Sequence, residues 1–148
     1  MLWYSQSVPA TDTVPVGYDW TTEPEFDNNY LTIDRDQFAA LYETDNIFPE
    51  RRVGRATYGW TAESIAATKA IRARAAELAP PTLLFQAGLD GVVVNQAQTE
   101  FCAQAPRCEL TKFTVAKHEL LFAQAPVRQA LLQQLQAFLD DPSTSTQR

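Results

Sequence analysis

The sequence predicts an α/β protein whose second half contributes part of a parallel sheet. Two short apolar runs, 82–87 and 110–115, have the length and composition of strands, and the first suits a strand that is buried on both faces. A helical pattern of apolar residues follows each run. This order of strand, turn, helix, strand, loop and helix is typical of a parallel α/β sheet.

The first part of the chain predicts an irregular segment followed by a helix. Residues 1–31 contain prolines, a glycine and the pair Asn28-Asn29 among scattered aromatic residues, with neither helical nor strand periodicity. Asp34, with Gln37 three residues later, is typical of an N-cap. The helix that it begins is expected to end before Pro49.

A second helix is expected before the sheet. Thr57 predicts its N-cap, and its apolar positions continue to Leu78, ahead of Pro80-Pro81. Most of the acidic excess of the chain lies before this double proline, and the texture of the sequence changes after it. The chain therefore divides into two differently built segments.

Local signals place the remaining elements. Gly88–Gly91 predicts a turn, and Asn95 is a candidate N-cap for a helix that Pro106 ends. Pro126 suits the first position of a last helix, which Asp140–Pro142 should end. A short loop that holds the chain's single histidine separates the second strand from this helix.

Composition excludes several classes of function. A net charge of −6, from 18 acidic and 12 basic residues, leaves no basic stripe for a phosphate backbone, so we expect no nucleic-acid partner. No stretch approaches the ~20 apolar residues of a transmembrane helix. The spacing of Cys102 and Cys108 fits no common zinc pattern, so we expect free thiols, no metal and no cofactor. A cytoplasmic chain follows, with peripheral contact at the inner membrane left open.

Asp90 and His118 are the candidate catalytic residues. Each comes just after a predicted strand, and the carboxyl ends of parallel strands meet at one edge of a sheet. An aspartate beside a histidine fixes the tautomer of the imidazole and stabilises its protonated form. Two plainer interpretations remain open: the histidine is a satisfied surface residue, and the aspartate serves its glycine-flanked turn.

A family resemblance favours the catalytic interpretation. The runs Pro81–Asn95, Phe101-Cys102 and Lys117–Phe122 resemble the last part of bacterial lysophospholipases related to monoacylglycerol lipases, in the serine aminopeptidase-like family. Upstream, the family's cap region is similar to Asn29–Thr32, Asp34-Arg35 and Thr57–Trp60, so the resemblance covers roughly residues 26–140. It implies a partial α/β-hydrolase fold, with Asp90 as the acid and His118 as the base of a Ser-Asp-His triad. Glu119 and the apolar residues after it are carried over only as packing.

The nucleophile of such a triad is missing from this sequence. The family's serine lies on a Gly-x-Ser-x-Gly elbow, and none of Ser5, Ser7, Ser64, Ser143 and Ser145 is flanked by glycines. We therefore expect a truncated chain or half of a split protein, inactive alone, whose partner is the missing N-terminal half. The strand at 82–87 should then present an unpaired edge, and the chain should be sticky and fold poorly.

We expect three segments: a cap or lid at 1–79 and the C-terminal part of the hydrolase core at 80–141, which the resemblance implies, and a disordered tail at 142–148. The aromatic residues that crowd the first 60 positions either line an acyl-chain pocket in this cap or pin a loop-rich segment to the core. The expected activity is hydrolysis of lysophospholipid or monoacylglycerol esters, although aminopeptidase-like and haloperoxidase-like relatives keep the substrate class open. A non-catalytic module that pairs through its exposed sheet edge is the alternative.

Overall fold

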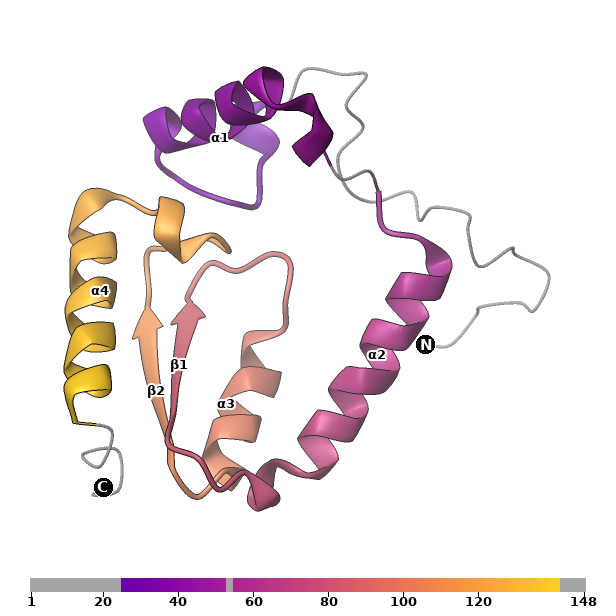
Figure 1. Cartoon of the computed structure of the whole chain (residues 1–148), viewed down its shortest axis with the longest axis vertical. Coiled ribbons are helices and arrows are strands. Elements are labelled where there is room, and N and C mark those ends of the chain that lie inside the picture. Colours follow the sequence, from indigo (N-terminus) through magenta and orange to yellow (C-terminus); the bar gives the residue numbers. More distant parts are fainter. Residues whose placement is uncertain (1–24, 53–54, 142–148) are drawn as a thin grey trace.

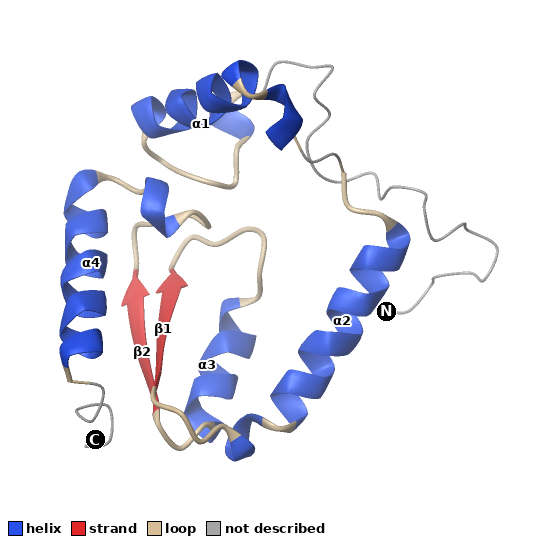
Figure 2. Ribbon diagram, viewed as in Figure 1, coloured by secondary structure: helices blue, strands red, loops and turns tan. Residues whose placement is uncertain are grey.

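Two parallel strands form the centre of the fold in a computed structural model that describes residues 25–52 and 55–141 (Figure 1). The helices and strands are α1 (Arg35–Ile47), α2 (Tyr58–Ala73), β1 (Thr82–Ala87), α3 (Asn95–Gln104), β2 (Cys108–Phe113) and α4 (Ala125–Asp140). Single 3-10 turns occupy Phe26–Asn28, Pro49–Arg51, Ala75–Glu77 and Leu120–Phe122. In Figure 2, the two strands lie between two helices, with α3 on the side of β1 and α4 on the side of β2.

The predicted parallel pairing of the two strands is confirmed. Register runs from Thr82 opposite Cys108 to Ala87 opposite Phe113. The first strand has the predicted bounds, but the second begins and ends two residues earlier than the predicted 110–115. Backbone pairing explains the difference, because the polar start of β2 completes the ladder with Thr82 and the apolar Val115 lies in the turn beyond it.

The core is thin and is built mainly from small side chains. Ala87, Ala116 and Ala123 form its buried cluster, against which Phe113 and Val127 pack among others. The prediction that β1 is buried on both faces is wrong for most of its length, since only Gln86 and Ala87 are buried. Within the described residues β1 has a strand on one side only, which leaves its other side chains half-exposed.

Both predicted helix caps in the first half are confirmed. The Asp34 carboxylate accepts hydrogen bonds from the amides of Asp36 and Gln37 and begins α1, and the Thr57 hydroxyl accepts one from Trp60 and begins α2. α2 ends at Ala73 rather than near Leu78, because the backbone leaves helical geometry at the next residue and tightens into a 3-10 turn.

Asn95 does not cap α3 as predicted. Val94 holds the N-cap position without a side-chain hydrogen bond, and Asn95 is the first helical residue. The amide of Asn95 instead donates to the carbonyls of Ala87, at 2.8 Å, and Gly88, at 3.3 Å. These carbonyls lie at the carboxyl end of β1, where the ladder stops, so the side chain ties the helix to the strand.

The last helix, α4, begins at Ala125, one residue before the predicted first position at Pro126.

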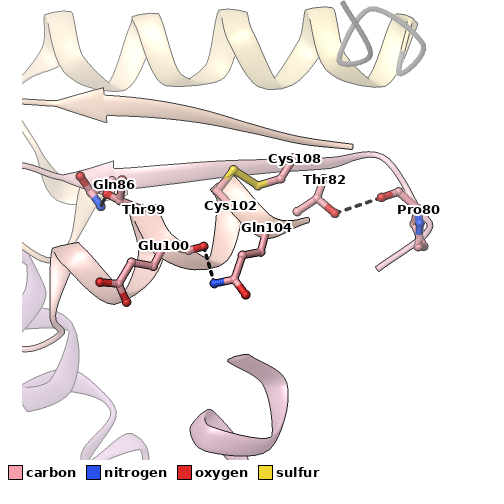
Figure 3. Close-up of a disulfide and its surroundings, with 8 residues drawn as sticks. All are labelled: Pro80, Thr82, Gln86, Thr99, Glu100, Cys102, Gln104 and Cys108. Atoms are coloured by element: carbon pink, nitrogen blue, oxygen red, sulfur yellow. Dashed lines mark hydrogen bonds between the residues drawn. A yellow bond between two sulfur atoms is a disulfide. The ribbon is translucent and has the colours of Figure 1, made fainter. Parts of the chain in front are cut away.

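The two cysteines are not free thiols, and that prediction is wrong. Cys102 and Cys108 form a disulfide that joins the last turn of α3 to the first residue of β2 (Figure 3). The chain reverses between the helix and the strand, which brings the two Cα atoms to 5.2 Å, within the range that a disulfide spans.

Some predictions fall outside the description. The tail at 142–148 and the aromatic residues before position 25 are not among the described residues. Of the helices in the described ranges, none has the length and apolar character needed to cross a bilayer.

Candidate active site

Asp90 and His118 lie beside one another at the carboxyl end of the sheet. Asp90 follows β1 in a tight turn, and His118 lies in the loop after β2; Figure 1 shows both loops at the arrowhead end of the strands. The Nδ1 atom of His118 is 3.0 Å from Oδ2 and 3.1 Å from Oδ1 of Asp90. The two residues that the sequence singled out are therefore in hydrogen-bond contact across 28 positions of chain.

The Asp90 carboxylate is fixed by its own turn as well as by the imidazole. Its Oδ1 accepts hydrogen bonds from the amides of Val92, at 2.8 Å, and Val93, at 3.0 Å, and its side chain is only 3% exposed. The plainer interpretation, an aspartate that serves its turn, is thus part of the geometry. One carboxylate both stabilises the turn and contacts the histidine.

The same contacts keep Asp90 ionised. Burial alone would raise the pKa of this carboxyl. The Val93 amide, the His118 ring and the Val92 amide donate to it, and with the charge of a protonated His118 they hold its pKa below the ordinary value. At neutral pH the site therefore carries a carboxylate.

An ionised carboxylate determines which nitrogen of His118 carries the proton. A carboxylate only accepts hydrogen bonds, so Nδ1 must donate, and in the neutral form of the imidazole Nε2 keeps its lone pair. The imidazole is 29% exposed, and within residues 25–52 and 55–141 no group hydrogen-bonds Nε2. Chemically, the pair can take a proton from a group that approaches Nε2 and stabilise the imidazolium that results.

A close backbone approach holds the two loops together. The amide of Gly88 donates to the Phe113 carbonyl at 2.8 Å, and that of Leu89 donates to the Ala116 carbonyl at 2.9 Å. A Cβ atom at position 88 would lie 2.6 Å from the Cα and carbonyl oxygen of Thr114. Only glycine lets the turn after β1 come so near the turn after β2.

A third segment, residues 29–32, joins these loops, and sequence reasoning missed its role. The carbonyls of Tyr30 and Leu31 accept hydrogen bonds from the amides of His118, at 3.3 Å, and Glu119, at 2.9 Å. The Tyr30 ring lies so close to the acid's turn that a Cβ at Gly91 would be 2.7 Å from it. The only signals were the Asn28-Asn29 pair and the resemblance of residues 29–32 to the family.

An apolar groove of about 650 Å³ runs beside the Asp90 turn. Its walls come from α2, α3, Leu84 of β1 and the side chains of Val92, Val93 and Val94. Among the described aromatic residues before position 61, none lines it. Phe26, Phe38 and Tyr42 instead pack on one another. Lys69 and Arg72 also line the groove, and Arg72 forms an ion pair with Glu100.

Side chains of metal-binding type do not gather in the described part of the chain. It holds no cluster of three or more histidine, cysteine, aspartate or glutamate residues of the kind that binds a metal ion. Asp90 and His118 are too few to form such a cluster, and both cysteine sulfurs are occupied by their disulfide.

Most of the chain is similar in sequence to known proteins. Residues 7–125 match the family described as serine aminopeptidase, S33. The chain is 34% identical over 131 residues to proteins named lysophospholipase L2 from two Escherichia coli strains, an alignment that covers 82% of this chain. It spans 37% of the length of these relatives. The chain therefore belongs to the serine aminopeptidase, S33, family of hydrolases, and it is a lysophospholipase-like member.

Proposed function

We propose that this chain supplies the acid and the base of a carboxylic ester hydrolase that acts on lysophospholipids or monoacylglycerols. Asp90 orients the imidazole, and His118 is the general base. The observation that carries the proposal is the contact of 3.0 Å between the buried carboxylate and Nδ1, which leaves Nε2 available. The similarity to Escherichia coli proteins named lysophospholipase L2 supports the substrate class. Because such substrates are amphiphiles, peripheral contact with the inner membrane belongs to the proposal.

The mechanism needs a nucleophilic serine on a Gly-x-Ser-x-Gly elbow, and this sequence has no such elbow. In the assembled site, Nε2 of His118 takes the proton from a serine hydroxyl as its oxygen attacks the ester carbonyl. The imidazolium, stabilised by Asp90, then gives that proton to the departing alcohol. Water, activated by the same nitrogen, releases the fatty acid and regenerates the serine. Because no Gly-x-Ser-x-Gly elbow occurs in the sequence, the chain alone should show no turnover.

The serine-bearing part of the hydrolase is the proposed partner, and β1 offers it a surface. Within the described residues β1 pairs only with β2, so its other edge has free backbone donors and acceptors. The apolar groove borders the same strand through Leu84. A further parallel strand on this edge would extend the sheet, and the element beside it would cover the groove. The new strand's carboxyl end would face the same way as Asp90 and His118.

Complementation tests the proposal. The full chain is mixed with the serine-bearing part of a family relative, and labelling by a serine-directed phosphonate and hydrolysis of a lysophospholipid are measured. We expect both activities only in the mixture, and we expect His118→Ala to abolish hydrolysis while Glu109→Gln, on the exposed side of β2, leaves it unchanged. A mixture of folded, bound parts that hydrolyses equally well with His118→Ala would overturn the proposal. Robust turnover by the chain alone would refute its inactivity.

A non-catalytic interaction module remains the second candidate, because the same free edge of β1 suits strand addition to another protein. The two functions differ in what the edge binds. A module would form a stable complex that needs no serine-bearing part, and His118→Ala would change nothing that the complex does. A complex that forms only with the serine-bearing part and that hydrolyses the ester would support the enzyme function.

A further inference from the structure

We propose that the Asn29 turn, residues 29–32, positions His118 relative to Asp90, and that the side chain of Asn29 fixes the conformation of this turn. The inference rests on the proposed function, because it assigns a role to residues that act through His118. It adds to that function a third segment, which comes from the region before α1.

The turn is organised by one buried amide. Asn29 is 4% exposed, and its Oδ1 accepts hydrogen bonds from the amides of Leu31, at 2.9 Å, and Thr32, at 2.8 Å. Its Nδ2 donates to the carbonyl of Phe26. A buried polar side chain with all of these partners is costly to replace, since each amide would lose its acceptor away from water. Asn29 therefore fixes the direction in which the next carbonyls point.

Those carbonyls hold the histidine loop. Tyr30 and Leu31 accept from the amides of His118 and Glu119, and the ammonium group of Lys117 donates to the carbonyl of Asn29 at 2.7 Å. Three consecutive residues of the loop are thus bound to three consecutive carbonyls of the turn. The backbone on which the imidazole is mounted has little freedom to shift relative to the turn.

The turn also touches the acid's side of the site and is anchored beyond it. The Tyr30 ring lies against Gly91, the neighbour of Asp90. Thr32, 1% exposed, donates from its hydroxyl to the Phe122 carbonyl at 2.6 Å. The Asn29 turn therefore contacts both loops that carry the pair. A shift of the turn would change the separation and angle of the imidazole and carboxylate rather than only the stability of the chain.

The test is a spectroscopic measurement on the full chain, without the serine-bearing part and without substrate. Because the sequence has one histidine, 15N-histidine labelling gives one pair of ring-nitrogen signals, which report how often Nδ1 carries the proton. The spectra are recorded at a pH where titration shows the imidazole to be neutral, in solution or in a frozen sample if the chain self-associates. Asp90→Ala supplies the reference for a histidine without its partner.

We expect Asn29→Ala to lower the share of the Nδ1-protonated form by about twofold or more, toward the Asp90→Ala reference, because the partner of Nδ1 selects the tautomer. Asn28→Ala is the matched control. Its side chain is exposed and donates to Glu25, so its loss should leave the signals unchanged. Asn29→Asp keeps an acceptor for the two amides but loses the donor to the Phe26 carbonyl, so it should restore only part of the share that Asn29→Ala loses.

Lys117→Met covers the case in which Asn29→Ala does not fold. It removes one hydrogen bond to the turn from a partly exposed side chain and should cause a smaller shift in the same direction. The inference is overturned if a folded Asn29→Ala variant keeps the wild-type signals. If Asn29→Ala is unfolded, wild-type signals in Lys117→Met overturn it instead. Failure of the complementation experiment with a normal tautomer response would instead overturn the proposed function alone.

Discussion

Two regions of the molecule are built in opposite ways. One is the loop cluster at the carboxyl end of the sheet, which consists of the Asp90 turn, the His118 loop and the Asn29 turn. The other is the groove face, the surface beside β1 that lines the apolar groove. In the loop cluster, three segments distant in sequence are joined by backbone hydrogen bonds, and alanines at 87, 116 and 123 pack beneath them. On the groove face, Ile65, Ile71 and Val94 are 41%, 59% and 69% exposed, and the edge of β1 has no strand partner among the described residues. The backbone groups that join the segments of the loop cluster are paired with one another, whereas the groove face exposes apolar side chains and a strand edge that is unpaired in the described part of the chain.

This difference teaches where each part of the proposed site gets its geometry. The acid and base need no further element to reach hydrogen-bond distance, because the two strand ends and the Asn29 turn already hold them. The groove face has the apolar surface and free strand edge that favour association. Changes in the loop cluster should therefore affect chemistry and folding, and changes on the groove face should affect association.

The largest effect is expected where the loop cluster meets the chemistry. Asp90→Asn replaces a carboxylate by an amide that can donate to Nδ1, which would leave the proton on Nε2 and remove the base. In the complemented enzyme we expect kcat/KM to fall by about 10⁴-fold. Asp140→Asn, an exposed carboxylate at the end of α4, is the control and should change the rate less than about twofold. A loss below about tenfold for Asp90→Asn would contradict the assigned role.

The packing of the loop cluster is broken most directly at Gly88. In Gly88→Ala the new methyl group meets backbone atoms of Thr114 that have nowhere to move, so we expect a loss of about 3 kcal/mol in the free energy of unfolding. Gly91→Ala meets the ring of Tyr30, which is 61% exposed and can rotate away, and should cost less than about 1 kcal/mol. Urea unfolding of both variants measures the contrast, and equal losses would disprove it.

Local chemistry made part of this structure predictable. The N-caps at Asp34 and Thr57 bond to amides within three residues, so their sequence neighbourhood contains the whole interaction. The proximity of Asp90 and His118 followed from two strand ends that a parallel sheet must place side by side. Their catalytic role stays a prediction.

Contacts between distant segments were not predictable. The amide of Asn95 finds carbonyls at the end of β1 instead of capping its own helix, and the cysteines pair because the chain reverses between α3 and β2. The Lys117 contact with the Asn29 carbonyl spans 88 positions. The sequence around each of these residues does not indicate which distant residue it will contact. Periodicity and capping patterns therefore cannot predict these interactions.

The disulfide tests whether the lower end of the sheet, away from the site, also stabilises the chain. Reduction should lower the free energy of unfolding by roughly 2 kcal/mol, since the loop between Cys102 and Cys108 is short and closing it removes little chain entropy. Thermal melts with and without reductant give the shift. A chain with alanine at both positions should be insensitive to reductant, and an unchanged melt of the wild type would show that the link contributes nothing.

Acid should weaken the loop cluster through Asp90. Because contacts in the folded chain lower the pKa of this carboxyl, its stabilising contribution is present above the unfolded-state pKa and is lost as the pH falls through the folded-state pKa. We expect wild type to be more stable than Asp90→Asn by about 1 kcal/mol at neutral pH, with the gap closing in the acid range. Urea unfolding over a pH series measures it. A gap that stays constant into strong acid would contradict the linkage.

The groove face should give the smallest change in stability. Ile65→Gln and Ile71→Gln remove apolar side chains from α2 that are already half-exposed, and glutamine is a good helix former. Each should change the free energy of unfolding by less than about 0.5 kcal/mol. If the serine-bearing part covers the groove, each should still weaken its binding by about 1 kcal/mol, or roughly fivefold in Kd. Leu139→Gln, 64% exposed on α4, is the matched control. Equal weakening by all three variants would place the docking surface elsewhere.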